Sequence, residues 1–280
     1  FTVMTIFLVN DAFADRLDQM ISPVTNPVNF EDPRINSEFR FIFVHHEFDD
    51  DFVTAGGDLQ LYALQLRYAI NEDLAFIATK DGYIDFNPEA LPDDSGWANI
   101  EPGFKYSFYK DAEAGNIASA ILRYELPLGD SEVFQGEGDG VIHPSVSAAF
   151  ALGEQTNFMA ASGLRIPVNS DDSMLWDVDV HVDHQISLGG DMSLYPLLEV
   201  NMVHVADAGK RLPIADEGGD VINFGSTEAD GKTLVTGALG ARLRTGDSVD
   251  LGVAYQVPLT SGAGSNLFDW RLTADVIVSF

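Results

Sequence analysis

The chain of 280 residues contains no cysteine, no long apolar run and few basic residues. Without cysteine there is no disulfide framework, no thiolate metal site and no cysteine nucleophile. No stretch reaches the roughly 18 consecutive apolar residues that a transmembrane helix needs. Lysine and arginine number 15 against 44 acidic residues, which gives a formal net charge of −29. This balance argues against nucleic acid and against an anionic membrane surface as partners.

What the sequence does contain is alternation, most clearly at its C-terminal end. Even positions from Phe268 to Phe280 are all apolar, whereas Asp269, Arg271 and Asp275 stand at odd positions. So long a strand with period two is typical of a membrane strand with one face toward lipid. Its terminal Phe and alternate apolar positions resemble the C-terminal strand of bacterial outer-membrane β-barrels, where this pattern is the assembly signal. The resemblance implies a porin-like barrel in the outer membrane of a Gram-negative cell.

Strand-length segments with turn signals between them recur from residue 38 onward. They are residues 38–48, 59–70, 74–86, 100–109, 117–128, 141–152, 157–168, 175–186, 192–205, 233–243, 249–259 and 267–280. Segments of about 10 to 13 residues are long enough to cross the hydrocarbon layer when tilted, whereas strands of soluble proteins average about 5–6. The fold class predicted is therefore all-β: a transmembrane, antiparallel, up-and-down β-barrel of twelve strands.

The connections between these segments alternate in length. Those after the even-numbered segments are short, such as residues 71–73 and 153–156. Those after the odd-numbered segments are mostly longer and rich in acid and glycine, such as residues 87–99 and 206–232. Short periplasmic turns and long external loops are typical of outer-membrane barrels, so both chain termini are expected on the periplasmic side.

The barrel itself is expected to occupy residues 37–280, preceded by two short regions. Residues 1–14 combine a short apolar run with an Ala-Phe-Ala sequence ending at Ala14, as in the last part of a signal peptide. They are interpreted as a signal-peptide remnant, with a retained N-terminal segment as the alternative.

Residues 15–36 show no sustained period and contain Pro23, Pro27 and Pro33. Such a stretch is expected to be extended rather than helical or part of a sheet. Two interpretations stay open: an arm in the periplasm, and a plug folded into the lumen of the barrel.

A weak internal repetition places proline near the end of three strands, in residues 124–129, 164–169 and 255–260. Proline removes a ladder donor, so these positions are expected to mark the exit of the chain from the barrel wall. Together with residues 22–27, these pieces loosely resemble the outer-membrane family associated with phenol meta-pathway degradation. That resemblance implies uptake of small molecules and identifies no site.

Parity assigns the polar positions of the strands to the lumen, because the apolar positions are expected to face lipid. The predicted pore lining carries charges of both signs, and arginine–carboxylate pairing across the lumen is expected. It consists of Arg67, Glu101, Lys105, Arg123, Glu125, Arg165, Asp177, Asp179, His181, Asp183, Glu199, Arg242, Arg244, Arg271 and Asp275.

No metal site and no cofactor are predicted. Asp177, Asp179 and His181 share one face of a strand, but neighbours on a face stand about 6.6 Å apart, too far for three to bind one ion. The acidic clusters in the loops lack the spacing of a dedicated calcium loop, so solvated charge is expected there. His45 and His46 point to opposite faces.

The function predicted is a passive channel for small solutes, not an enzyme. One alternative is a barrel closed by its own side chains or by residues 15–36, with a structural or binding role. A less favoured alternative is an outer-membrane lipid hydrolase; Ser145 and Ser147 lie near His143, but no nucleophile motif is present. The expected partners are outer-membrane lipid and a small-molecule solute, and association with other copies of the chain is left open. Residues 206–232 could fold inward as a constriction or outward as a binding surface.

Overall fold

The computed structural model describes residues 16–169, 171–262 and 264–280, so the predicted signal remnant at residues 1–14 lies outside it. In this part of the chain no helix is long and apolar enough to cross a membrane. Its helical elements are the short 3₁₀ helices η1 (Arg16–Gln19) and η2 (Ser131–Val133). Its strands are β1 (Glu38–Phe48), β2 (Gly57–Ala69), β3 (Leu74–Ala78), β4 (Tyr83–Pro88), β5 (Asp94–Trp97), β6 (Pro102–Asp111), β7 (Asn116–Glu125), β8 (Val141–Ala151), β9 (Thr156–Pro167), β10 (Met174–His184), β11 (Ile186–Gly189), β12 (Met192–Asp207), β13 (Thr233–Thr245), β14 (Val249–Pro258) and β15 (Phe268–Ser279).

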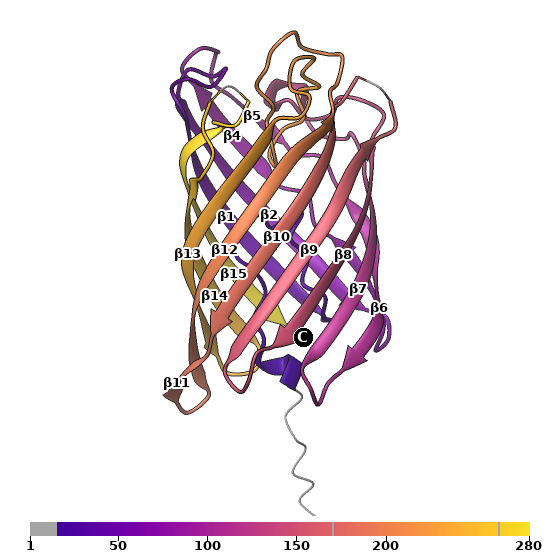
Figure 1. Cartoon of the computed structure of the whole chain (residues 1–280), viewed down its shortest axis with the longest axis vertical. Coiled ribbons are helices and arrows are strands. Elements are labelled where there is room, and N and C mark those ends of the chain that lie inside the picture. The colour runs from indigo at the N-terminus through magenta and orange to yellow at the C-terminus, as the bar shows by residue number, and fades with distance from the viewer. Residues whose placement is uncertain (1–15, 170, 263) are drawn as a thin grey trace, which may run out of the picture.

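These strands form one closed antiparallel barrel (Figure 1). Strand β1 pairs with β2 on one side and with the last strand, β15, on the other, so the sheet has no free edge there. Strands β3 and β4 together fill the third position of the wall, β5 and β6 fill the fourth, and β11 only extends a hairpin with β12. The predicted twelve-stranded barrel is confirmed.

Alternation along each strand sorts side chains between the two faces of the wall. In β1, Arg40 and Val44 are buried toward the lumen, whereas Phe39 and Phe41 are 40% and 51% exposed on the outside. The same parity holds along most of β15. The expectation that Phe268 faces outward is wrong, because a β-bulge beside Glu47 shifts the register and turns this ring inward.

The two rims differ as the alternating connections predict (Figure 1). The short-turn rim carries η1 and the β11 hairpin, and the long-loop rim carries the connections after β1, β12 and β14. The expectation of a plain loop at residues 87–99 is wrong in one respect. Residues 94–97 form β5, which pairs with β4 and raises the wall on this side.

The wall is interrupted between β3 and β4. Over residues 79–82 the ladder to β2 is replaced by side-chain bonds: the Asp81 carboxylate accepts from the backbone N–H of Leu64 at 3.1 Å, and the Gln65 amide donates to the Thr79 carbonyl. An outer groove of about 730 Å³ lies over this interruption, with Tyr62 and Trp97 among its lining. Part of the wall is thus closed by side chains instead of backbone.

Candidate functional site

The lumen is occupied by the chain's own N-terminal segment. We call residues 20–35 the luminal segment; most of its side chains are buried, and Met20, Ile21, Val24 and Phe30 are fully inaccessible. In Figure 1 it follows η1 upward from the short-turn rim into the barrel. The prolines predicted an extended segment, and it has no helix or strand. Its buried backbone groups therefore need other partners, which are turns within the segment and side chains of the wall.

The first attachment is a buried carboxylate between two cations. Glu31 accepts from Arg67 Nε and Nη2 at 2.8 and 2.6 Å and from Lys105 Nζ at 2.8 Å. Burial alone would raise the pKa of Glu31, but the charges and hydrogen bonds of Arg67 and Lys105 outweigh it and hold that pKa at about 2. Glu31 is therefore ionised at neutral pH and balances charges from two wall strands.

In the second attachment, two arginines of the wall bind backbone carbonyls of the luminal segment. Arg40 Nη2 donates to the carbonyls of Pro23 and Val24 at 2.8 and 3.2 Å, and Arg242 Nε donates to that of Ser22 at 3.2 Å. Both guanidiniums also bind Asp275, which lies between them and offsets their charge. These bonds hold the backbone of residues 22–24 and do not depend on the side chains at those positions.

Room for the arginine–aspartate group comes from a glycine on β14, the strand that lies between Arg242 on β13 and Asp275 on β15. A Cβ atom on Gly252 would lie 2.4 Å from Asp275 Oδ1 and 3.0 Å from Arg242 Nη2. No side chain fits there without displacing the ion pair. Gly252 is thus part of the site although it has no polar group of its own.

In the third attachment, a carboxylate of the wall binds backbone N–H groups of the luminal segment. The Glu199 carboxylate accepts from the N–H groups of Val24 and Thr25 at 2.8 and 2.7 Å. Its Oε1 also bonds His181 Nδ1 at 2.7 Å, and His181 Nε2 bonds Asp183 at 3.0 Å. With both ring nitrogens facing carboxylates, His181 is held as a bridge between them. The predicted acidic row on β10 therefore supports the luminal segment.

Further contacts fix the turn at residues 26–28. The Asn26 amide donates to Asp179 at 2.7 Å, and Asn201 donates to the same oxygen at 2.8 Å. Arg123 donates to the Val28 carbonyl and lies 3.3 Å from Glu101. The luminal segment is consequently bonded to opposite sides of the wall.

The β12–β13 loop (residues 208–232) folds inward at the other rim. Its Ile222 and Phe224 are each 4% exposed and belong to an aromatic-rich cluster with Phe48 and Phe52 from the β1 side. The Phe224 ring centre lies 6.2 Å from that of Phe52. Of the two placements open to this loop, the described residues adopt the inward one.

One ion pair ties the β12–β13 loop to the wall. Asp220 accepts from Arg271 Nη1 and Nη2 at 2.5 and 2.9 Å, and Arg165 Nη1 donates to the Gly219 carbonyl at 2.8 Å. Burial would raise the pKa of Asp220, but the Arg271 charge outweighs it and lowers that pKa. Arg271 also donates to His46 Nδ1.

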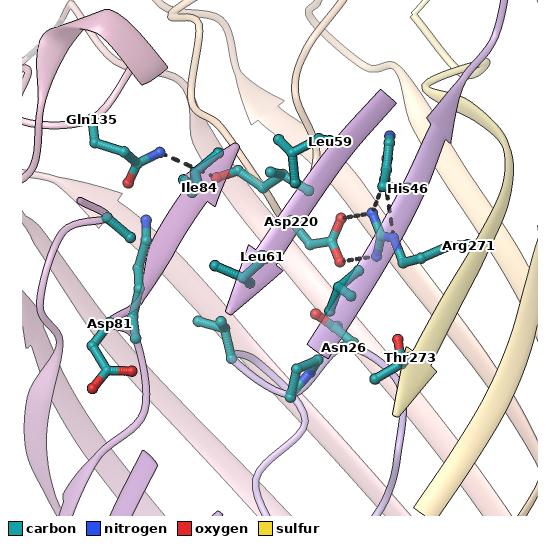
Figure 2. A pocket seen from close by; sticks show the side chains of 16 residues that line it. Asn26, His46, Leu59, Leu61, Asp81, Ile84, Gln135, Asp220, Arg271 and Thr273 are labelled. Carbon is teal, nitrogen blue, oxygen red and sulfur yellow. Dashed lines mark hydrogen bonds and ion pairs between the residues drawn. The ribbon is translucent and has the colours of Figure 1, made fainter. Parts of the chain in front are cut away.

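A small cavity remains between the two closures (Figure 2). It has a volume of about 50 Å³, and one water needs roughly 10–15 Å³ on this measure, so it has room for a few waters. Its lining is mainly apolar, with Val44, Leu59, Leu61 and Ile84 from the wall. Asp81 and Ala98 line both this cavity and the outer groove.

The residues predicted to line the pore are placed as follows. Twelve are buried and contact the luminal segment, the β12–β13 loop or another predicted pore-lining residue: Arg67, Glu101, Lys105, Arg123, Asp177, Asp179, His181, Asp183, Glu199, Arg242, Arg271 and Asp275. Glu125, Arg165 and Arg244 are partly buried and pair with Lys80, Asp177 and Asp250. Their lining of a transport path stays a prediction.

Sequence reasoning missed Arg40, Glu31, His46 and Gly252. Parity along β1 could have found Arg40 and His46, since both fall on the face opposite Phe39 and Phe41. The signal for Gly252 was its place on the inward face of β14. Glu31 had none, because the luminal segment lacks a period.

The described residues contain no group of three or more potential metal ligands placed to hold an ion. His143, weighed for hydrolysis, bonds Glu101 through Nδ1 and Arg123 through Nε2, at 3.0 and 3.1 Å. Both ring nitrogens are thus occupied, although Ser145 and Ser147 lie two and four residues away.

Comparison with known proteins finds likeness in structure but not in sequence. No protein-family model matches the chain, and no curated protein matches it. The COG4313 outer membrane channel from Pseudomonas putida F1 is similar at a TM-score of 0.61 and 15% identity, over 93% of this chain and all of that one. The β domain of the Bordetella autotransporter BrkA (TM-score 0.51, 12% identity, 88% and 100% covered) and the NanC porin (0.50, 9%, 87% and 98%) are also similar. The fold is that of outer-membrane channels and porins.

Proposed function

We propose that this protein is an outer-membrane channel for small solutes that its luminal segment closes at rest. In this proposal the short-turn rim and both termini face the periplasm, and the long acidic loops face the exterior. The observation that carries it is the luminal segment itself, which is held inside the barrel by charged groups on several strands. The likeness in fold to the COG4313 channel supports the same class.

The lining and the volume of the cavity favour a solute that is small and largely apolar. Val44, Leu59, Leu61, Ile84 and Val221 are among the residues that line it. At about 50 Å³ it is well below the roughly 150 Å³ that holds benzene, so larger solutes require movement of a closure. The proposed channel is thus gated, which adds a closure to the passive channel predicted from the sequence.

Single-channel conductance in a planar bilayer tests the proposal. The full chain is expected to be nearly silent, and a variant lacking residues 16–35 to conduct stably with a preference for cations, since the net charge is −29. A folded deletion variant that stays silent would favour the closed structural barrel instead.

A reversible lock provides the matched control. Thr25 Oγ1 and Asn201 Oδ1 lie 2.9 Å apart, and the chain has no native cysteine. Thr25→Cys with Asn201→Cys should abolish the brief openings of the full chain when oxidised and restore them on reduction. Thr25→Cys alone should respond to neither treatment.

A route through the wall is a second candidate, favoured by the residues that the cavity and the outer groove share. Asp81 and Ala98 separate a luminal space from a lipid-facing one where the backbone ladder is interrupted. Cross-linking Leu64→Cys to Asp81→Cys should slow uptake of an apolar solute without changing ionic conductance. Equal slowing of both would assign the effect to the lumen.

A further inference from the structure

A second and larger cavity lies at the short-turn rim; we call it the rim cavity. Its volume is about 450 Å³, several times the roughly 150 Å³ that holds benzene. The luminal segment lines it with Ser22, near the start of that segment, and with Arg34, near its end. The wall lines it with Asp250 and Ile277, and the exposed Asp247 borders it, so it opens toward solvent. The rim cavity thus lies between the wall and the two legs of the luminal segment.

The two arginines that line the rim cavity already use all their nitrogens as donors. Arg244 donates to the Asp250 carboxylate and to backbone carbonyls near the start of the luminal segment. Arg34 donates to Asp32 and to carbonyls of the same region. An anionic ligand would therefore have to compete with existing ion pairs for either guanidinium.

The carboxylates of the rim cavity are in the opposite condition. Glu38 is 3% exposed, and its Oε1 accepts no hydrogen bond. It lies 3.4 Å from Arg67 Nη1, but Arg67 directs its Nε and Nη2 to Glu31. The exposed carboxylates of Asp18 and Asp247 accept no hydrogen bond from any described residue. A buried carboxylate without hydrogen bonds is costly, so Glu38 points to a donor that the described chain does not supply.

The chemistry of the lining defines the ligand class. Unbonded acceptors beside arginines that already donate favour a cation with N–H donors, and an ammonium group has three. Ile35 and Ile277 add apolar surface for a short hydrocarbon chain. A bare metal ion fits less well, because the described residues hold no group of three or more ligands placed around one point.

We propose that the rim cavity binds a small aliphatic ammonium ion, such as an alkyl diamine, and that this cation holds the channel closed. An ammonium group donates to Glu38 in the interior, and Asp18 and Asp247 attract the cation at the entrance. Withdrawal of the luminal segment removes Ser22 and Arg34 from the lining, so the site exists only in the closed state. A ligand that binds one state alone stabilises that state. The role in gating rests on the proposed function, whereas binding does not.

Isothermal titration calorimetry of the full chain in non-ionic detergent tests the site. The probe is 1,4-diaminobutane, with 1,4-butanediol as its uncharged analogue and magnesium chloride at equal ionic strength for unspecific screening. The diamine should bind saturably at one site, and the diol should not bind. Glu38→Gln should weaken binding about tenfold, because it removes a charged acceptor. Glu154→Gln, an exposed position in the short turn between β8 and β9, should leave binding unchanged.

A second variant keeps the test valid if Glu38→Gln does not fold. Asp18→Asn with Asp247→Asn changes two exposed side chains and should weaken binding about threefold. The site is overturned by the absence of saturable binding, by equal binding of magnesium, or by full affinity in both the Glu38→Gln and the double variant.

Single-channel recording tests the role in gating separately. Diamine added on the short-turn side at ten times its dissociation constant should make the brief openings of the full chain about tenfold rarer. The variant lacking residues 16–35 should not respond. Binding without a change in openings overturns the role in gating. A deletion variant that stays silent counts against the proposed function alone, because calorimetry detects the site without conductance.

Discussion

The two closures of the barrel are built from opposite chemistry. The luminal segment is held mainly by charged and backbone hydrogen bonds, through Glu31, Arg40, Arg242 and Glu199. The β12–β13 loop is held mainly by apolar packing of residues such as Phe224, with Asp220 as its main ionic tie to the strands. Charged hydrogen bonds are directional and sensitive to pH, whereas apolar contacts are neither. The two ends of the lumen should therefore open under different conditions.

The largest expected effect comes from breaking the charged closure at its centre. Glu31→Ala leaves Arg67 and Lys105 buried and facing each other, and removal of one partner from such a group costs about 3–5 kcal/mol. The free energy of unfolding in lipid vesicles should fall by this amount at pH 7. Glu132→Ala, at an exposed position, should change it by less than about 0.5 kcal/mol. Equal effects of both would mean that Glu31 is not an anchor.

Truncation of the apolar closure should act locally. Phe224→Ala removes a ring from the cluster with Phe52, at a cost of about 3 kcal/mol. Amide exchange in residues 208–232 should accelerate on the order of 100-fold, while residues 20–35 keep their protection. Acceleration in both regions would show that the closures are coupled.

Acid should distinguish the closures without mutation. The pKa of Glu31 is about 2 in the folded chain against 4.5 for the free group, so the unfolded chain binds the proton first as pH falls. The contribution of Glu31 to stability is present above pH 4.5 and is lost toward pH 2, by about 3 kcal/mol in all. Denaturant titrations of the native chain and Glu31→Gln should converge over this range. Curves that stay parallel would contradict the assignment.

The smallest expected effect tests the space around the arginine pair. Gly252→Ala places a methyl group against Asp275 and Arg242 and should cost about 1–3 kcal/mol. The substitution should also increase the open probability of the full-length channel, because Arg242 donates a hydrogen bond to the Ser22 carbonyl. Val253→Ala, the outward neighbour, serves as the control. No change in gating would limit the role of Gly252 to packing.

Much of the barrel was predictable because apolar and polar residues alternate along every strand. A strand that faces lipid needs an apolar residue at each second position, so the orientation of Arg242 and Asp275 followed from parity. The number of strands followed from the turn signals between the segments. The luminal segment was not placed, because it has no period and its bonds are made by backbone groups. Glu31 could not be assigned for the same reason, and Phe268 was misplaced by a bulge that parity does not reveal. Closure of the lumen depends on contacts between residues far apart in sequence, which local patterns do not encode.

Both ends of the luminal segment lie at the same rim. Arg16 bonds the turns after β6 and β8, and Ser37 meets Phe280 where β1 begins, all on the short-turn side. The segment therefore enters and leaves the barrel as a single loop and never threads through it. Withdrawal and return need no free chain end to pass the lumen and no strand pair to separate. Opening of this kind is topologically simple, so its rate is set by the bonds that hold the loop and not by disentanglement of the chain.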